Sequence, residues 1–162
     1  KKQAKEAVKA AAEQAGQAYV VERWVGGMLT NVTTTGAQIK KLKDLERRMA
    51  SGDLEKRYNK LEVQRFQEEI DSLNLKYSGI KDLNGHPGAV IVLDTLVDAN
   101  AIREAKTLGV PVVGVVDTNA NPDAIDYVIP GNDDAIKGLQ LFLDYFVAAI
   151  QEGAGSAKKE EN

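Results

Sequence analysis

The chain has 162 residues, with 21 basic and 24 acidic side chains, one His, no Cys and a formal net charge of -3. The absence of Cys excludes a disulfide framework, thiol catalysis and Cys-ligated metal sites, and a single His excludes a multi-His metal site. The length predicts one domain, and the apolar runs are too short to span a membrane. Because the sequence begins at Lys1, without Met or an apolar signal segment, we expect a fragment of a longer chain.

The charge is divided unevenly along the chain. Residues 1–81 hold 16 basic and 11 acidic side chains, a net charge of +5, whereas residues 82–162 hold 5 and 13, a net charge of -8. Such an asymmetry is typical of proteins with a nucleic-acid partner for the basic half. The alternative is ordinary variation of surface charge.

The first 34 residues predict a helix, a short strand and a loop. Residues 3–15 are rich in Ala and Glu and carry a stripe of small residues, which favours a helix. Gly16 is a suitable stop for it. Ala18–Val21 is predicted as a short strand, and residues 23–31 (RWVGGMLTN) as an ordered loop around a Gly pair.

Residues 35–77 have the pattern of two paired helices. The apolar positions are spaced three and four residues apart, as in the seam of a coiled coil, and the remaining faces are mostly charged. Ser51-Gly52-Asp53 interrupts the first helix, and residues 53–60 form a predicted polar crossing. We therefore expect an antiparallel coiled-coil hairpin that projects from the domain. The seam consists of Leu42, Leu45, Met49, Val63, Phe66, Ile70, Leu73 and Tyr77.

The second half of the chain predicts a parallel sheet. Continuous runs of β-branched residues are typical of strands covered on both faces, and they occur at 89–93, 110–116 and 127–129. A helix over 99–108, capped by Asp98 or Asn100, separates the first two runs.

A second helix, over 135–151, follows the acidic stretch 132–134, which suits its first turn. The predicted fold is α/β, a doubly wound, mainly parallel, flavodoxin-like sheet with the hairpin inserted. Its α/β domain comprises residues 1–34 and 78–152, the coiled-coil hairpin residues 35–77, and a disordered tail residues 153–162.

Motifs for catalysis or nucleotide binding are weak. No G-x-G-x-x-G follows a strand and no P-loop is present, and a turn explains Gly26-Gly27. Asp94 and Asp117 end successive strands and can hold Mg²⁺ or accept a phosphoryl group, or simply bind loop amides. His86 lies in a turn sequence. An α/β protein that binds a nucleotide or sugar phosphate through Asp94 and Asp117, with Asn119 nearby, is therefore an alternative.

Basic side chains crowd the hairpin. Lys40, Lys41, Lys43, Arg47 and Arg48 lie on its first helix. Such a run is usually a solvated face with ion pairs such as Asp44–Arg48. On a projecting hairpin it is also suited to contact phosphates. A coiled-coil adaptor that binds a protein helix is a third hypothesis.

Two segments, RWVGGMLTN (23–31) and IKKLKDLE (39–46), closely resemble the bacterial small-subunit ribosomal protein S-two family. Residues 90–135 agree in order, including DTN-x-x-P (117–122) and IPGNDDA (129–135), and the resemblance covers 1–153. It implies a structural constituent of the small ribosomal subunit, placed between head and body and in contact with small-subunit rRNA. It implies no enzyme activity, cofactor, metal or membrane.

The resemblance also implies partners and a location. The partners are neighbouring small-subunit ribosomal proteins, including the large S-one protein that captures mRNA. The location is the cytoplasmic ribosome, with an organellar ribosome as the alternative.

Family members begin upstream with a segment that this sequence lacks, so we expect the sheet to lack its first strand. Val32–Thr35 also stands where the family tends to have basic or charged residues.

Carried onto this sequence, the family's RNA-facing positions fall in the loop and on the hairpin. Trp24 either stacks on a base or wedges the loop against the sheet, while turn and capping needs also explain Asn119, Gly131 and Asn132. The predicted RNA-binding residues are Arg23, Trp24, Gly26, Gly27, Thr30, Asn31, Lys40, Lys41, Lys43, Arg47 and Arg48.

Overall fold

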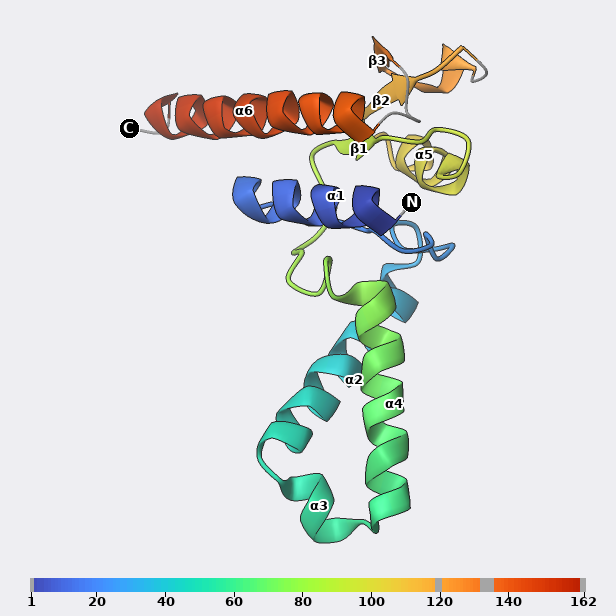
Figure 1. Ribbon diagram of the computed structural model, residues 1–162, viewed down its shortest axis with the longest axis vertical. Coiled ribbons are helices and arrows are strands. Elements are labelled where there is room, and N and C mark those ends of the chain that lie inside the picture. The colour runs from blue at the N-terminus through green and yellow to red at the C-terminus, as the bar shows by residue number, and fades with distance from the viewer. Residues whose placement is uncertain (1, 119–120, 132–135, 161–162) are drawn as a thin grey trace.

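A computed structural model describes residues 2–118, 121–131 and 136–160. These residues form six α-helices, three strands and one short 3₁₀ helix (Figure 1). The helices are α1 (Lys2–Ala15), α2 (Val32–Ala50), α3 (Asp53–Arg57), α4 (Lys60–Tyr77), α5 (Ala99–Thr107) and α6 (Ile136–Glu160). The strands are β1 (Val90–Val92), β2 (Val112–Val116) and β3 (Tyr127–Pro130), and the 3₁₀ helix is η1 (Pro122–Ala124).

The three strands form a parallel sheet in the order β1-β2-β3. Val90 of β1 lies opposite Val112 of β2, and Val113 of β2 lies opposite Tyr127 of β3. The central strand β2 is the most buried of the three. Its continuous β-branched run therefore reflects burial on both faces. The predicted parallel pairing is confirmed, but the expected coverage of both faces is wrong for β1 and β3, where Ile91, Tyr127 and Val128 are exposed.

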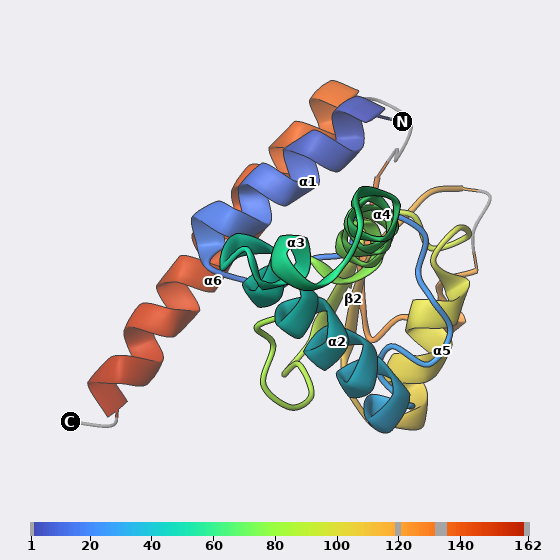
Figure 2. The ribbon, with the colours of Figure 1, turned by 90° about the horizontal axis from the view of Figure 1, so that it is seen from below.

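Helices cover the sheet on two sides, with α5 on one and the α1–α6 pair on the other (Figure 2). Val92 and Val112 from the strands pack with Ile102 and Ala105 of α5 in one apolar cluster. Ala11 of α1 packs with α6 in another, which also contacts Leu93. The molecule is therefore an α/β protein. The flavodoxin-like, doubly wound order stays a prediction, because the three described strands do not include the reversal of strand order that defines it.

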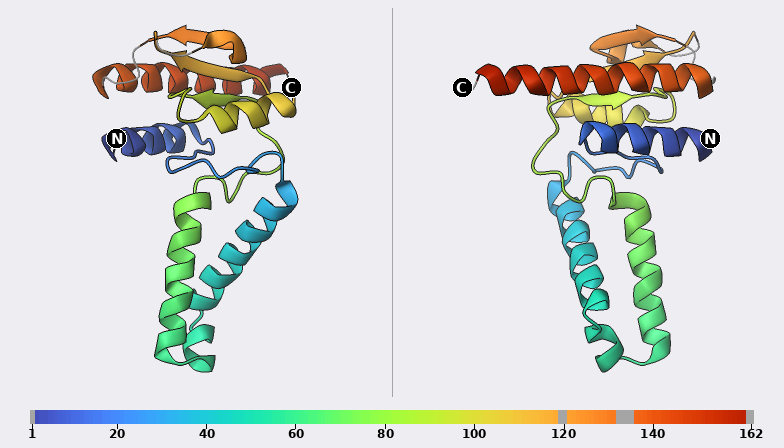
Figure 3. Two further views of the ribbon diagram at one scale, coloured as in Figure 1. Left: turned by 90° about the vertical axis from the view of Figure 1, so that its right-hand side faces the viewer. Right: turned by 60° about the vertical axis from the view of Figure 1, so that its left-hand side comes forward.

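Helix α2 leads away from this body and α4 returns to it, antiparallel to α2, with α3 at the far end of the hairpin (Figures 1 and 3). Leu42 and Leu45 of α2 pack against the last turns of α4 in a third apolar cluster. That cluster also contains Met28 of the 23–31 loop, so the hairpin and the loop share one core. The coiled-coil geometry of the pair stays a prediction, as do the domain boundaries; α2 itself begins at Val32.

Three expectations from the sequence differ from the structure. Ala18–Val21 is not a strand; the backbone N–H of Tyr19 donates to the Gly79 carbonyl at 3.0 Å. A Cβ at Gly79 would stand 2.1 Å from the Tyr19 carbonyl oxygen, so this crossing needs glycine. The polar crossing contains helix α3, because Asp53 and Glu55 occupy its first turn and Lys56 and Arg57 its last, where each charge suits the helix dipole.

The third difference is at the C-terminal side. Helix α6 continues to Glu160, so the disordered tail predicted from residue 153 is wrong for residues 153–160. Ala, Lys and Glu in this stretch favour a helix, and their preference outweighs the helix-breaking tendency of Gly153 and Gly155.

Of the predicted helix caps, Asp98 does occupy the N-cap of α5, but its side chain makes no capping hydrogen bond. The cap predicted at Asn132–Asp134 lies outside the described residues. Within the described ranges, no helix has the length and apolar character needed to cross a membrane.

Candidate nucleic-acid interface

The 23–31 loop is organised by one carboxylate, that of Glu104 in α5. Its Oε1 accepts hydrogen bonds from the indole N–H of Trp24 at 3.0 Å and from the backbone N–H of Gly27 at 2.7 Å. Its Oε2 accepts from the backbone N–H groups of Leu29 at 2.9 Å and Thr30 at 3.2 Å, and from the Thr30 hydroxyl at 3.2 Å. Five donors from four loop residues thus converge on one side chain.

Glu104 is a buried charge, 9% exposed, whose described partners are all neutral donors. Burial alone would raise the pKa of Glu104, because it removes water from the charged form. The hydrogen bonds from Trp24 and from the backbone of Gly27, Leu29 and Thr30 outweigh this effect, so the pKa is lowered. The carboxylate is therefore ionised at neutral pH and holds the loop as an acceptor.

The two glycines of the loop have different roles. Gly27 has a φ of +89°, and a Cβ there would stand 3.1 Å from the Cβ of Asn31. Gly26 has no positive φ and no atom within 4 Å of an added Cβ. The turn explanation of the Gly pair therefore applies to Gly27, and Gly26 lies exposed at the surface.

The other predicted loop residues also serve the loop itself. Trp24 is half-buried and packs against the sheet cluster and the hairpin cluster, which is the wedge position. Asn31 caps α2 by accepting the backbone N–H of Thr34 at 3.2 Å. Thr30 donates its hydroxyl to Glu104. Arg23 is exposed, and it has no ion-pair partner among the described residues.

Four of the five predicted hairpin cations are in ion pairs. Lys41 contacts Glu69 of α4, and Lys43 contacts Asp82 at 2.9 Å. The expected Asp44–Arg48 pair is wrong. Arg47 pairs with Asp44, three residues before it on α2, and Arg48 pairs with Asp53 at 3.0 Å. The four pairs are Lys41–Glu69, Lys43–Asp82, Arg47–Asp44 and Arg48–Asp53.

The fifth, Lys40, is exposed and has no acidic partner in the part of the chain that the structure describes. Helical spacing of three and seven residues places Lys40 on the same side of α2 as Lys43 and Arg47. This side is opposite the buried Leu42 and Leu45. The outward face of α2 therefore presents three cations, of which Lys40 is the least neutralised.

Polar contacts fix the base of the hairpin to the body. The carboxylate of Glu46 in α2 accepts from the Asn74 amide of α4 at 2.8 Å and from Lys81 at 3.2 Å. The hydrogen bond from Asn74, followed by that from Lys81, lowers the pKa of Glu46. These contacts hold the basic face of α2 in a defined position beside the loop.

The strand-end aspartates have local roles. Asp94 accepts the backbone N–H groups of Leu96 at 3.1 Å and Val97 at 2.9 Å, and Asp117 accepts that of Thr118 at 2.6 Å. No group of three or more potential metal-ligating side chains occurs among the described residues. Asn119 lies outside them.

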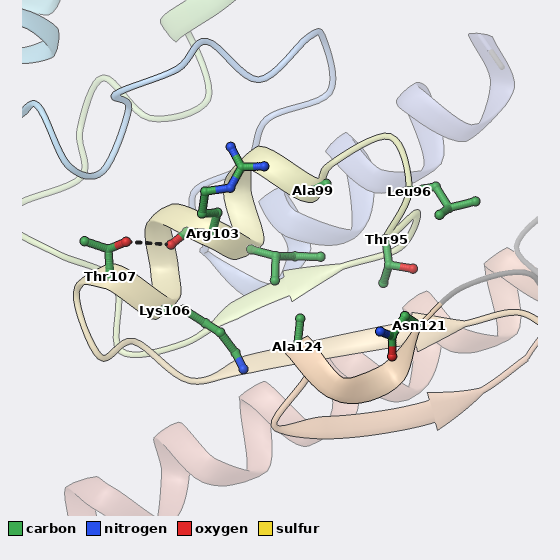
Figure 4. Close-up of a pocket in the computed structure, with 9 residues that line it drawn as sticks. Thr95, Leu96, Ala99, Arg103, Lys106, Thr107, Asn121 and Ala124 are labelled. Carbon is green, nitrogen blue, oxygen red and sulfur yellow. Dashed lines mark hydrogen bonds between the residues drawn. The ribbon is translucent and has the colours of Figure 1, made fainter.

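A pocket of about 630 Å³ lies beside α5 and η1 (Figure 4). Its two cations, Arg103 and Lys106, point to different sides of α5 in Figure 4, so their charges do not converge on one ligand position. Asp94 and Asp117 do not line it. The pocket thus gives the small-molecule alternative no cluster of charged groups.

Glu104, the residue that organises the loop, was not among the predicted site residues. A signal was present, since Ala101, Glu104, Ala105 and Leu108 follow the spacing of an apolar helix face. An acid on such a face needs hydrogen-bond partners if it is buried. Those partners lie more than seventy residues away in sequence, and no local pattern identifies them.

The structure is a scaffold with an exposed cationic side. It consists of an α/β body, a loop held by a buried carboxylate and a projecting basic hairpin. Residues 1–153 match the model of the family described as Ribosomal protein S2. The chain belongs to this family. The expectation of a non-enzymatic protein agrees with the family, which is named for a ribosomal protein and not for a catalytic activity.

Individual relatives agree. The chain is 45% identical over 161 residues to the small ribosomal subunit protein uS2 of Maridesulfovibrio salexigens, covering 99% of this chain and 62% of that protein. It is 47% identical to the protein of the same name from Actinobacillus pleuropneumoniae serotype 5b and 48% identical to that from Haemophilus ducreyi, with 67% of each covered. The chain thus spans about two thirds of the length of these relatives.

Proposed function

We propose that the chain is a structural constituent of the small ribosomal subunit that binds small-subunit rRNA between head and body. The observation that carries this proposal is the family match over residues 1–153. Relatives at 45–48% identity are named as proteins of the small ribosomal subunit. In this role the chain supports translation as part of a ribonucleoprotein and catalyses no reaction.

The charge distribution supports RNA as the ligand. Arg23 in the loop and Lys40 on the hairpin are exposed and unneutralised among the described residues. Lys43 and Arg47 lie on the same side as Lys40, in exposed ion pairs. Such pairs contribute little to stability, and a phosphate can replace the carboxylate. Binding then releases counterions from the RNA, without reading its sequence.

The predicted RNA-binding residues divide by role under this proposal. Arg23, Gly26, Lys40, Lys41, Lys43 and Arg47 present exposed backbone or charge to the phosphates. Trp24, Gly27, Thr30 and Asn31 give the loop its shape, since their side chains are bonded within the protein or, for Gly27, the backbone has a positive φ. Arg48 serves the hairpin, because its side chain is less exposed than those of the other paired cations of α2.

The proposal extends to protein partners and location. The acidic half of the chain, at -8, includes most of the α/β body, and its outer surface is suited to neighbouring small-subunit ribosomal proteins. These include the large S-one protein that captures mRNA. The hairpin acts as a coiled-coil arm on a doubly wound body, and the location is the cytoplasmic ribosome, with the organellar ribosome as the alternative.

Co-sedimentation with small ribosomal subunits tests the assembly role, and rRNA binding at increasing KCl tests the contacts. A Lys40, Lys41 and Lys43 triple Ala variant should bind rRNA more weakly. Its slope of log affinity against log salt should fall by about 0.9 for each phosphate that the variant no longer neutralises.

The matched control removes three exposed lysines outside the loop and hairpin, Lys9, Lys106 and Lys137. Its slope should equal that of the parent protein. Equal losses of affinity in both triple variants would contradict a localised interface, and a parent protein that does not sediment with small subunits would contradict the proposed function.

A further inference from the structure

The loop that carries Arg23 has little regular structure of its own to hold its shape. Residues 17–31 contain no helix or strand of the described structure. The turn over residues 26–30 is held by the packing of Met28 and Leu29, by hydrogen bonds to the carbonyls of Val25 and Gly27, and by the hydrogen bonds of three of its residues to Glu104. Of the hydrogen bonds among the described residues, only those to Glu104 join the turn to α5. The shape of this loop therefore depends on a buried residue that lies outside it.

We propose that Glu104 is the positioning residue of the RNA interface, which fixes the 23–31 loop so that Arg23 and Gly26 meet the phosphate backbone in one arrangement. This inference rests on the proposed function. Glu104 lies on α5, is 9% exposed and cannot itself contact the RNA. It acts through the loop.

The division of donors between the two carboxylate oxygens makes the site specific for a carboxylate. Oε1 receives Trp24 and Gly27, and Oε2 receives Leu29 and both donors of Thr30. In Glu104→Gln one oxygen becomes an NH₂ group, which can only donate. In either orientation of the amide, two or three of the five loop donors then face another donor and lose their partner.

In the unbound Glu104→Gln variant, the 23–31 loop then samples more conformations than in the wild-type protein, and RNA binding has to order it. Ordering costs free energy that the wild-type protein has already supplied in folding, so preorganisation by Glu104 raises affinity without a contact to the ligand. Lys40 lies on α2, whose position is fixed at the hairpin base by the hydrogen bonds of Glu46 with Asn74 and Lys81. Its contribution should therefore be independent of Glu104.

The test measures binding of a labelled small-subunit rRNA transcript as a function of KCl, for Glu104→Gln, Arg23→Ala, Lys40→Ala and the double variants. Glu104→Gln should bind about tenfold more weakly, the size expected when binding has to order one or two side chains or a short loop. In the double-mutant cycle, Glu104→Gln and Arg23→Ala should be strongly non-additive, whereas Glu104→Gln and Lys40→Ala should add. If Glu104 only stabilised the fold, Glu104→Gln would reduce the folded fraction, and its effect on affinity would be additive with Arg23→Ala and with Lys40→Ala alike.

Glu152→Gln is the matched control, because it makes the same change of charge at an exposed position of α6. It should bind as the parent does. Wild-type affinity in Glu104→Gln, or equal coupling to Arg23 and Lys40, would overturn the inference while leaving the proposed function intact. A parent protein that does not bind the transcript would instead overturn the proposed function.

If Glu104→Gln does not fold, Trp24→Phe and Thr30→Val provide the second measurement. Each removes one side-chain donor to Glu104 and keeps the apolar bulk. Each should weaken binding by less than Glu104→Gln and couple to Arg23→Ala. Full affinity in both folded variants would overturn the inference.

Discussion

Two adjacent glycines in the 23–31 loop meet different requirements, and this difference can be measured. Gly27→Ala forces a Cβ into a residue with φ of +89° and within 3.1 Å of Asn31. It should destabilise the protein by about 1–2 kcal/mol. Gly26→Ala meets no atom within 4 Å and has no positive φ, so it should change the free energy of unfolding by less than about 0.5 kcal/mol. Urea denaturation checks both values, and equal effects would contradict the assigned roles.

Asp98 carries an unfavourable charge. It stands at the N-cap of α5 without a capping hydrogen bond. Burial, and secondly the nearby Asp94, raise its pKa. A carboxyl whose folded pKa is raised binds its proton more tightly when folded. It therefore reduces stability as the pH rises from the unfolded pKa, about 3.9, through the folded value.

Asp98→Asn removes this ionisation and keeps a residue suited to an N-cap. The variant should be more stable than the parent at pH 7, and the difference should shrink as the pH falls below the unfolded pKa, where the Asp98 carboxyl is protonated in both states. Thermal unfolding followed by circular dichroism across this range measures it. A parent that is the more stable at pH 7 would show that the Asp98 carboxylate has a favourable partner.

At the scale of elements, the hairpin depends on apolar contacts near its base. Leu42 is fully buried between α2 and α4. Leu42→Ala should cost about 2–5 kcal/mol, the usual range for a buried Leu. Leu75→Ala, on α4 with 60% of the residue exposed, is the matched control and should cost less than about 0.5 kcal/mol. Comparable costs would mean that α2 and α4 do not pair in solution through this cluster.

Most helices and strands were predictable from the sequence, because their periodic apolar pattern is local. β2 and α5 follow from local pattern alone, since a strand buried on both faces and an amphipathic helix each have a recognisable period. Ala18–Val21 has the composition of a strand, but its neighbour is Gly79, sixty residues away. No periodicity reveals such a long-range contact.

The same limit applies to the site. The sequence indicates which residues carry charge, so Arg23 and the cations of α2 were identifiable. It does not indicate which acids neutralise them, because Glu69 and Asp82 belong to other segments. Glu104 is the extreme case, because its hydrogen-bond partners lie in a distant loop. The candidate interface was therefore predictable, and its internal support was not.

For the whole molecule, the net charge of -3 describes neither half of the chain. A polyanion responds to the local field, because charges more than about 8–10 Å apart are screened at physiological salt. The basic face of α2 should then determine RNA binding although the α/β body is acidic. An effect of local charge can therefore be distinguished from an effect of total charge by placing the same charge change on and away from the α2 face.

Lys40→Glu and Lys137→Glu make the same change in total charge at different places. Both lysines are exposed, Lys40 on the hairpin and Lys137 at the start of α6. Lys40→Glu should weaken rRNA binding by about tenfold at low salt, with the loss shrinking as KCl screens the charge, whereas Lys137→Glu should bind nearly as the parent does. Fluorescence anisotropy with a labelled rRNA transcript at several KCl concentrations measures both. Equal losses of affinity would mean that total charge, and not the α2 face, governs the encounter with RNA.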